Sequence, residues 1–235
     1  MANRKSKSIT VQGVELIDLT IASVRLDPRP IAGFCNDYPL VEPHPLPAPV
    51  LERLTFPSGK PLPPSLKRWL AFDGSWLQSL GWLSSLDVPI FTPRTLGQIA
   101  DAEYGLDMRQ VAALAGMEEG DLNFYSLLDP LFPECFLLPQ GTDSRRIFAV
   151  TEPDDMGEYP VLVIDEDDVS YVAVMYPGFD VYMGDVSGVL DLDFDTYESL
   201  HEDPRYAARL TFHARHLFGG KPSIELMDPE WPSEK

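Results

Sequence analysis

From residue 146 onward, the residue pattern takes the period of two that is typical of strands, and β-branched or aromatic residues fill most of the apolar positions. Acidic residues, prolines and glycines, which are typical of turns, separate the short segments that show this pattern. The pattern predicts four strands joined as an antiparallel meander, over residues 146–152, 159–165, 170–176 and 179–185.

Before this region the apolar positions follow a helical period. Leu66, Trp69 and Leu70 have the spacing of one helix face, after Pro64, which suits a first helical turn. This spacing predicts a helix within residues 63–74, with Gly74 in the left-handed position that ends it.

Three further helices are expected from capping and stop residues. One spans residues 93–104, and another begins at Asp107, which forms a capping box with Gln110, and ends at Gly116. After the strands, a long helix starts near residues 203–204 and ends at Gly219; a second capping box, Asp195 with Glu198, precedes it. The order of elements predicts an α+β fold: an antiparallel-rich sheet of about four to six strands, packed by helices from the N-terminal half and by a long C-terminal helix.

Length and composition agree with one such domain. The chain has 235 residues, of which 44% are apolar, enough to build a sizeable core. Cys35 and Cys135 have no metal-ligand spacing and are expected as buried apolar residues in a reducing compartment. The N-terminus lacks the apolar run of an export signal, and no window is apolar enough to span a bilayer, so we expect a cytoplasmic protein without membrane contact.

The charge distribution gives the main functional hint. The net charge is −19, which excludes binding to nucleic acid by bulk charge. Residues 147–204 contain 16 Asp or Glu and no Lys or Arg, so the rest of the chain carries only −3. Such a run is either a solvated face or a docking surface for a basic partner. For docking, the candidates lie in or beside the strand connectors: Asp154, Asp155, Glu158, Asp165, Glu166, Asp167, Asp168, Asp180 and Asp185.

Tryptophans offer a second candidate surface. Trp69 belongs to the apolar face of a helix that packs on the sheet. Trp76 and Trp82 are candidates for partly exposed anchors at a partner interface, where tryptophan is enriched.

Sharper catalytic or metal motifs were sought. Residues 191–202 place acids at several positions of a calcium-binding loop, but Thr196 stands where that loop needs glycine. His201, His213 and His216 lack the further ligands of a zinc site. No nucleotide-binding or serine-hydrolase motif is present, so we expect no metal, no cofactor and no enzymatic activity, although a triad assembled in space stays open.

The segment LPPSLKRWLAFDGSW (residues 62–76), the strands within residues 159–185 and the terminal helix together resemble the SUKH superfamily, also called Smi/Knr-type proteins. The resemblance covers residues 44–218. The chain departs from the family at residues 73–75, where Asp-Gly-Ser replaces an Asn-Gly-Gly-like turn. The resemblance divides the chain into an N-terminal extension (1–43), a SUKH-like domain (44–220) and a C-terminal tail (221–235).

The resemblance implies an immunity protein that binds and neutralises a cognate bacterial toxin, often a nuclease. We expect a non-enzymatic protein, monomeric or a small homo-oligomer, that docks its acidic sheet end on a basic surface of the toxin and occludes it. An intracellular adaptor or regulatory scaffold is the alternative. A hydrolase that uses acidic residues, with or without a metal, is a third interpretation.

Overall fold

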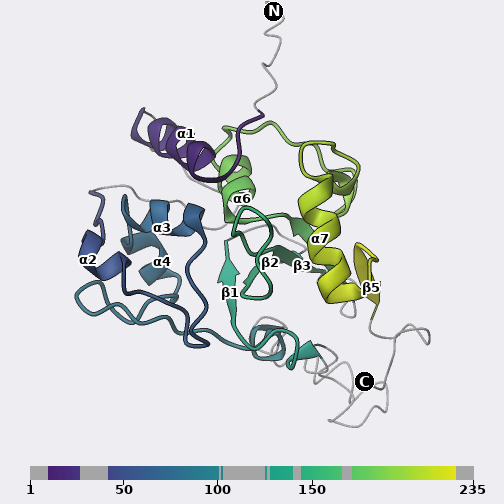
Figure 1. Cartoon of the computed structure of the whole chain (residues 1–235), viewed down its shortest axis with the longest axis horizontal. Helices are drawn as coiled ribbons and strands as arrows, with labels where there is room; N and C mark the ends of the chain where they lie inside the picture. Colours follow the sequence, from purple (N-terminus) through teal and green to yellow (C-terminus); the bar gives the residue numbers. More distant parts are fainter. Residues whose placement is uncertain are drawn as a thin grey trace, which may run out of the picture.

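A computed structural model describes residues 10–26, 42–100, 102, 125, 128–139, 144–165 and 171–225. Its centre is a five-stranded sheet in which each strand pairs antiparallel with the next (Figure 1). The strands are β1 (Cys135–Leu138), β2 (Ser144–Ala149), β3 (Val161–Asp165), β4 (Tyr171–Tyr176) and β5 (Ser223–Glu225). The sheet and its flanking helices confirm the predicted α+β class.

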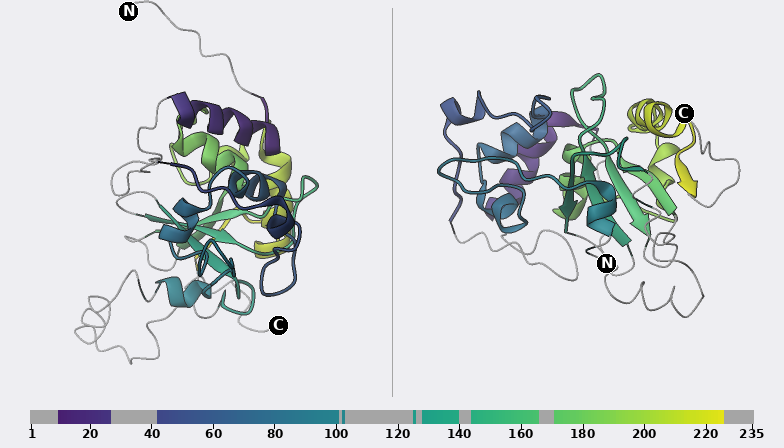
Figure 2. Two further views of the ribbon diagram at one scale, coloured as in Figure 1. Left: turned by 90° about the vertical axis from the view of Figure 1, so that its left-hand side faces the viewer. Right: turned by 90° about the horizontal axis from the view of Figure 1, so that it is seen from below.

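Helices lie on both sides of the sheet. They are α1 (Gly13–Leu26), α2 (Ala48–Leu51), α3 (Pro64–Leu70), α4 (Ser75–Ser79), α6 (Phe179–Val186), the short 3₁₀ helix η3 (Ser199–His201) and α7 (Ala207–Phe218). Helices α1 to α4 gather on one side, and α7 lies on the other, next to β5 (Figures 1 and 2). The N-terminal and C-terminal helices therefore enclose the sheet as the sequence predicts.

Three of the four predicted strands are confirmed as β2, β3 and β4, but the fourth is wrong, because residues 179–185 form α6. This helix contacts α1, α3 and β4, and Phe179, Val181 and Tyr182 are fully buried. A helix buried on most of its sides has no polar stripe, so its sequence does not show a helical period.

The helix predicted within residues 63–74 is confirmed as α3, but its end differs from the prediction. Ala71 ends α3, and Gly74 has φ −101°, outside the left-handed region, where it precedes α4. The Asp73 carboxylate accepts hydrogen bonds from the backbone N–H groups of Ser75 and Trp76. Asp73 thus caps a second helix immediately after the first.

The remaining helix predictions have mixed outcomes. The helix expected over 93–104 begins at Leu96, after a reciprocal capping contact between Thr95 and Gln98, and is described only as far as 100 and at 102. The helix expected over 107–116 lies outside the described residues. The terminal helix ends as predicted, with Gly219 at φ 65° in the left-handed region.

Two segments that were placed outside the domain belong to it. Helix α1 lies in the predicted extension (1–43) and packs on α6 and α3 through buried residues that include Leu16 and Ile21. Strand β5 lies in the predicted tail (221–235) and pairs with β4. The boundaries at 43 and 220 therefore need correction, because the sheet edge and an apolar helix face are completed from beyond them.

The predicted anchors Trp76 and Trp82 are core residues, with 4% and 1% of their surface exposed. The Trp82 ring packs on Phe136, with centroids 4.6 Å apart, and its Nε1–H donates to the backbone oxygen of Leu137 at 2.8 Å. Neither tryptophan offers surface to a partner, because both are buried: Trp76 packs on Trp69 of α3, and Trp82 packs on the sheet. Cys135 is buried, as predicted.

Within the described ranges, we find no helix with the length and apolar character that crossing a membrane requires.

Candidate functional site

The candidate docking acids do not form one patch, because the topology divides them between the two ends of the sheet. Asp154, Asp155 and Glu158 lie in the connector that follows β2, and Asp180 follows β4, which ends beside the start of β3. Asp165 ends β3 at the opposite end, where it pairs with Ser144 of β2. The predicted candidates Glu166, Asp167 and Asp168 lie outside the described residues.

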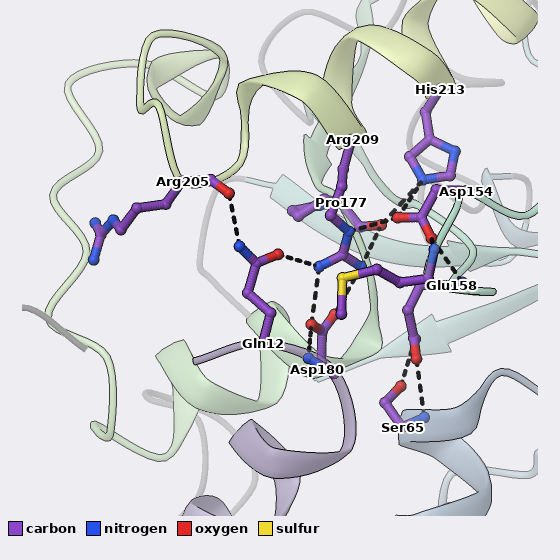
Figure 3. Close-up of polar contacts among 11 residues, drawn as sticks. Gln12, Ser65, Asp154, Glu158, Pro177, Asp180, Arg205, Arg209 and His213 are labelled. Atoms are coloured by element: carbon purple, nitrogen blue, oxygen red, sulfur yellow. Dashed lines mark hydrogen bonds and ion pairs between the residues drawn. The ribbon is translucent and has the colours of Figure 1, made fainter. Parts of the chain in front are cut away.

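At the first end, Arg209 of α7 neutralises two of these acids inside the protein (Figure 3). Its Nε donates to Asp154 at 2.5 Å, and its Nη1 and Nη2 donate to Asp180 at 2.9 and 3.1 Å. The Arg209 side chain is 9% exposed, and those of Asp154 and Asp180 are 1% and 0% exposed. One buried guanidinium thus serves two buried carboxylates, an arrangement that needs every partner present.

His213 completes the surroundings of Asp154. Burial alone would raise the pKa of Asp154, but His213 and Arg209 outweigh it and lower the pKa to about 2. The His213 Nε2 lies 3.7 Å from the Asp154 carboxylate and 3.1 Å from the backbone oxygen of Pro177, which accepts its hydrogen bond. Asp154 is therefore held as an anion by neighbouring donors and charge.

Glu158 has a different task, because it caps α3 from a distant part of the chain. Its carboxyl accepts hydrogen bonds from the backbone N–H and the hydroxyl of Ser65, at 2.9 and 2.5 Å (Figure 3). Burial, with the nearby charge of Asp180, raises the pKa of Glu158 to about 8. The connector after β2 thus fixes α3 against the sheet.

The same network ties down the start of α1. Gln12 accepts a hydrogen bond from Arg209 and donates one to the backbone oxygen of Arg205, both at 2.7 Å. The backbone N–H of Gly13 donates to Asp180 at 2.7 Å. Five parts of the chain meet around Arg209, and the role of this cluster is to hold α1, α3, α6 and α7 together.

These contacts correct the predicted docking surface. Asp154, Glu158 and Asp180 are interior groups with internal partners, so they cannot face a toxin. Asp155 alone is exposed among the candidates at this end. Sequence reasoning missed this because a buried acid and its arginine lie up to 55 positions apart.

A second group of acids surrounds an open hollow of about 530 Å³ along β4. Cross-strand pairing puts Arg146 of β2 on the same face as Ala173 of β4. A register shift between Val161 and Leu162 brings Tyr176 onto this face as well, opposite Val161. The β-bulge thereby adds a tyrosine to the wall of the hollow.

Four aromatic residues line the hollow. Tyr171 and Tyr176 come from β4, and Phe194 and Tyr197 come from the segment before η3. The rings of Tyr171 and Tyr197 are 5.9 Å apart, and those of Tyr176 and Phe194 are 5.5 Å apart. Each pair joins the strand to the segment that covers it.

Charged groups lie among these rings. Asp185, at the end of α6, accepts a hydrogen bond from the Tyr176 hydroxyl at 2.7 Å, and burial raises the pKa of Asp185. The Glu198 carboxylate accepts a hydrogen bond from the Tyr171 hydroxyl at 3.0 Å. Asp195 lines the hollow and is exposed. Two carboxylates therefore line the hollow, and a third, that of Glu198, is bound to one of its lining tyrosines.

One cation, Arg146, also lines the hollow. It is 6% exposed, donates to the Ser144 hydroxyl at 2.6 Å and stacks over the Tyr197 ring at 5.4 Å. Its buried Nε has no hydrogen-bond partner among the described residues. Buried polar atoms without a partner are rare in folded proteins.

Of the sequence candidates that the structure describes, only Asp185 lines this hollow. Asp195 and Glu198 belong to the segment with the incomplete calcium-loop pattern and the capping box, and Arg146 precedes the acidic run. The available signal was the continuation of acidic residues through Asp191, Asp193 and Asp195, all of which are exposed.

The three C-terminal histidines do not meet at a metal site. The ring nitrogens of His201, His213 and His216 contact the backbone oxygens of Val174, Pro177 and Phe212, respectively, at 2.8–3.1 Å. Across the described part of the chain, no group of three or more His, Cys, Asp or Glu residues is placed to hold a metal ion.

The comparisons with known proteins inform only the fold of this chain. No family model matches the chain. No curated protein matches it either. The chain is similar to the crystal structure of an uncharacterized protein from Salmonella enterica subsp. enterica serovar typhimurium str. 14028s, with a TM-score of 0.55 and 17% sequence identity, over 89% of this chain and 94% of that one. At this identity the likeness concerns the arrangement of helices and strands.

Proposed function

We propose that this chain is an immunity protein of the SUKH type, which binds a bacterial toxin domain in the cytoplasm and neutralises it by stoichiometric occlusion. The proposal keeps the partner that the resemblance of residues 62–76 and 159–185 implies. It moves the contact surface away from the connector that holds Asp154 and Glu158.

The observation that carries the proposal is the acidic rim of the hollow along β4. Asp185 and Asp195 line it, and Glu198 accepts a hydrogen bond from the Tyr171 hydroxyl of its wall. Asp191 and Asp193, which precede Asp195 in the chain, are exposed. Carboxylates on this rim attract a basic protein surface and raise the rate of association. Toxins that act on nucleic acid carry such a surface, because they bind phosphates.

The fold suits occlusion rather than catalysis. The hollow rests on a sheet that is fixed by helices on both sides, so its walls are set before the partner arrives. A rigid surface loses less conformational entropy on binding. Among the described residues, the polar side chains that line the hollow are two carboxylates, three phenols, the Thr196 hydroxyl and the Arg146 guanidinium, which is bound to Ser144.

The test uses the full chain and the toxin domain encoded by the neighbouring gene. We expect a one-to-one complex of the purified proteins by light scattering, and survival of cells that express both proteins. A matched toxin with an inactivated active site serves as the control for growth inhibition. Absence of a complex contradicts the proposal. A complex that leaves the toxin active supports the adaptor alternative instead.

A further inference from the structure

We infer that the hollow along β4 is a binding site for the basic side chain, arginine or lysine, of a protein partner. The identity of that partner as a toxin rests on the proposed function. The class of ligand rests on the walls, the charge and the size of the hollow.

The walls are suited to a cation. Four aromatic rings, those of Tyr171, Tyr176, Phe194 and Tyr197, border the hollow. Aromatic faces attract guanidinium and ammonium groups within about 6 Å of the ring centre. Tyr197 already holds the guanidinium of Arg146 at 5.4 Å, so the chain's own arginine demonstrates the mode of contact.

The charge of the site also favours a cation. Asp185 and Asp195 line the hollow, and Glu198 is bound to the Tyr171 hydroxyl of its wall. Among the described lining residues, Arg146 carries the one positive charge. The site therefore has an excess of carboxylates. An inserted basic side chain would place its charge between Asp185 and Asp195.

The volume and the aromatic walls indicate that the ligand belongs to a polypeptide. The hollow, at about 530 Å³, has room for a side chain together with the backbone that carries it. The aromatic walls can also pack against the apolar stem of an arginine or lysine side chain. A free inorganic cation has no such stem.

Small probes test the ligand class without the toxin. The full chain, labelled with ¹⁵N, is titrated with N-acetyl-arginine amide, with its neutral isostere N-acetyl-citrulline amide and with N-acetyl-glutamate amide. We expect saturable shifts at residues 171–176 and 194–197 for the arginine probe and an affinity at least about 5-fold weaker for citrulline, because the charge is lost. Equal binding of citrulline, or tighter binding of glutamate, overturns the inference.

Matched variants locate the site. We expect D185N/D195N to weaken binding of the arginine probe at least about 5-fold, and F194L, which keeps an apolar side chain but removes the ring, to weaken it about 2- to 5-fold. The control E152Q/D155N removes the same charge from the exposed connector after β2 and leaves binding unchanged. Equal losses in the control and in D185N/D195N overturn the inference, since general charge then explains binding. Thermal unfolding of each variant identifies any that fails to fold.

The same variants with the toxin separate this inference from the proposed function. If the toxin binds and D185N/D195N weakens the complex while E152Q/D155N does not, both stand. If the toxin binds both variants equally, the hollow is not the contact and only the proposed function survives. If the arginine probe binds specifically but the toxin does not, the ligand class stands and the toxin assignment fails.

Discussion

Arg209 of α7 donates two hydrogen bonds to Asp180, the second residue of α6, at 2.9 and 3.1 Å, although both side chains lie in the interior. Helix α6 contacts α1 and α3, so this ion pair connects the C-terminal helix with the N-terminal helical layer. Asp154 shares the same guanidinium. The acidity of the chain is therefore partly an internal structural feature.

Replacing Arg209 by methionine should destabilise the protein by about 3–5 kcal/mol, because Asp154 and Asp180 remain buried without their cation. Urea unfolding, followed by tryptophan fluorescence, measures the change. The comparison variant R205M removes a partly exposed arginine, which pairs with Asp203 at 2.6 Å, and should cost no more than about 1 kcal/mol. Similar losses in the free energy of unfolding for the two variants would show that the buried ion pair stabilises the protein no more than the exposed one.

Stability should fall as the pH rises from about 4.5 to about 8, because of Glu158. Its pKa is raised from 4.5 to about 8 in the fold, so the folded state keeps a proton that the unfolded chain releases. The stability that the protonated carboxyl contributes is complete below pH 4.5 and is lost as the pH approaches the folded pKa. Urea midpoints across this window measure the slope.

The variant E158Q isolates that effect from the general repulsion among the acids. It keeps the shape of the side chain and cannot ionise, so its stability should depend less on pH between 4.5 and 8 than that of the natural chain. An unchanged slope in E158Q would assign the pH dependence to other carboxyls.

Replacing Gly178 by alanine should destabilise the protein by about 1–3 kcal/mol through overpacking. A methyl group at this position would lie 2.5 Å from both the Arg209 guanidinium and the Asp180 carboxylate. It would push the ion pair apart. The matched variant G188A changes a glycine with nothing within 4 Å of the added carbon, so its cost, at φ 68°, reflects the backbone alone. The cost of G178A should shrink when R209M is also present, since the double variant removes the contact with the guanidinium, although the contact with Asp180 remains.

Replacing Trp82 by leucine should lower stability by about 2–4 kcal/mol and leave toxin affinity unchanged. The ring packs on Phe136 and Phe148, with centroids 4.6 and 5.4 Å away, so its loss opens a cavity in the core. Calorimetric titration at a temperature where the variant is folded measures affinity. A large loss of affinity in a fully folded W82L protein would restore this tryptophan as a binding residue.

Neutralising Asp165, Glu166, Asp167 and Asp168 together, by Asp→Asn and Glu→Gln, should slow toxin association and weaken its dependence on salt. Asp165 is half-buried at the end of β3, where its strand pairs with Ser144. Stopped-flow association at low and high salt measures the effect. Unchanged rates would remove this connector from the docking surface.

Strands β2, β3 and β4 were predictable because they are rich in β-branched and aromatic residues and turn residues separate them. Nearly all of their residues are buried. Helix α6 was not predictable. In a segment such as FDVYMGD, where even Asp180 is buried, the identity of the side chains does not distinguish a strand from an enclosed helix. Strands β1 and β5 are only four and three residues long and give too little pattern to recognise. Their places depend on pairing with β2 and β4, which is a property of the whole sheet.

The hollow was less predictable than the fold, because its walls come from β2, β4, α6 and the segment before η3. Tyr176 faces the hollow only because the β-bulge at Val161 shifts the strand register, and no local residue pattern predicts that shift. The charge run did indicate an acidic surface. It could not separate Asp185, which lines the hollow, from Asp180, which Arg209 neutralises.

The hydrogen bond between Gln12 and Arg209 joins residues 197 positions apart. A ribosome adds about 5–20 residues per second, so roughly 10–40 s pass between the synthesis of the two partners. During that interval Gln12, before α1, and Asp154, after β2, lack the Arg209 guanidinium of the last helix. Nascent chains that stall before α7 should therefore be sensitive to proteases and depend on chaperones until the final segment is released.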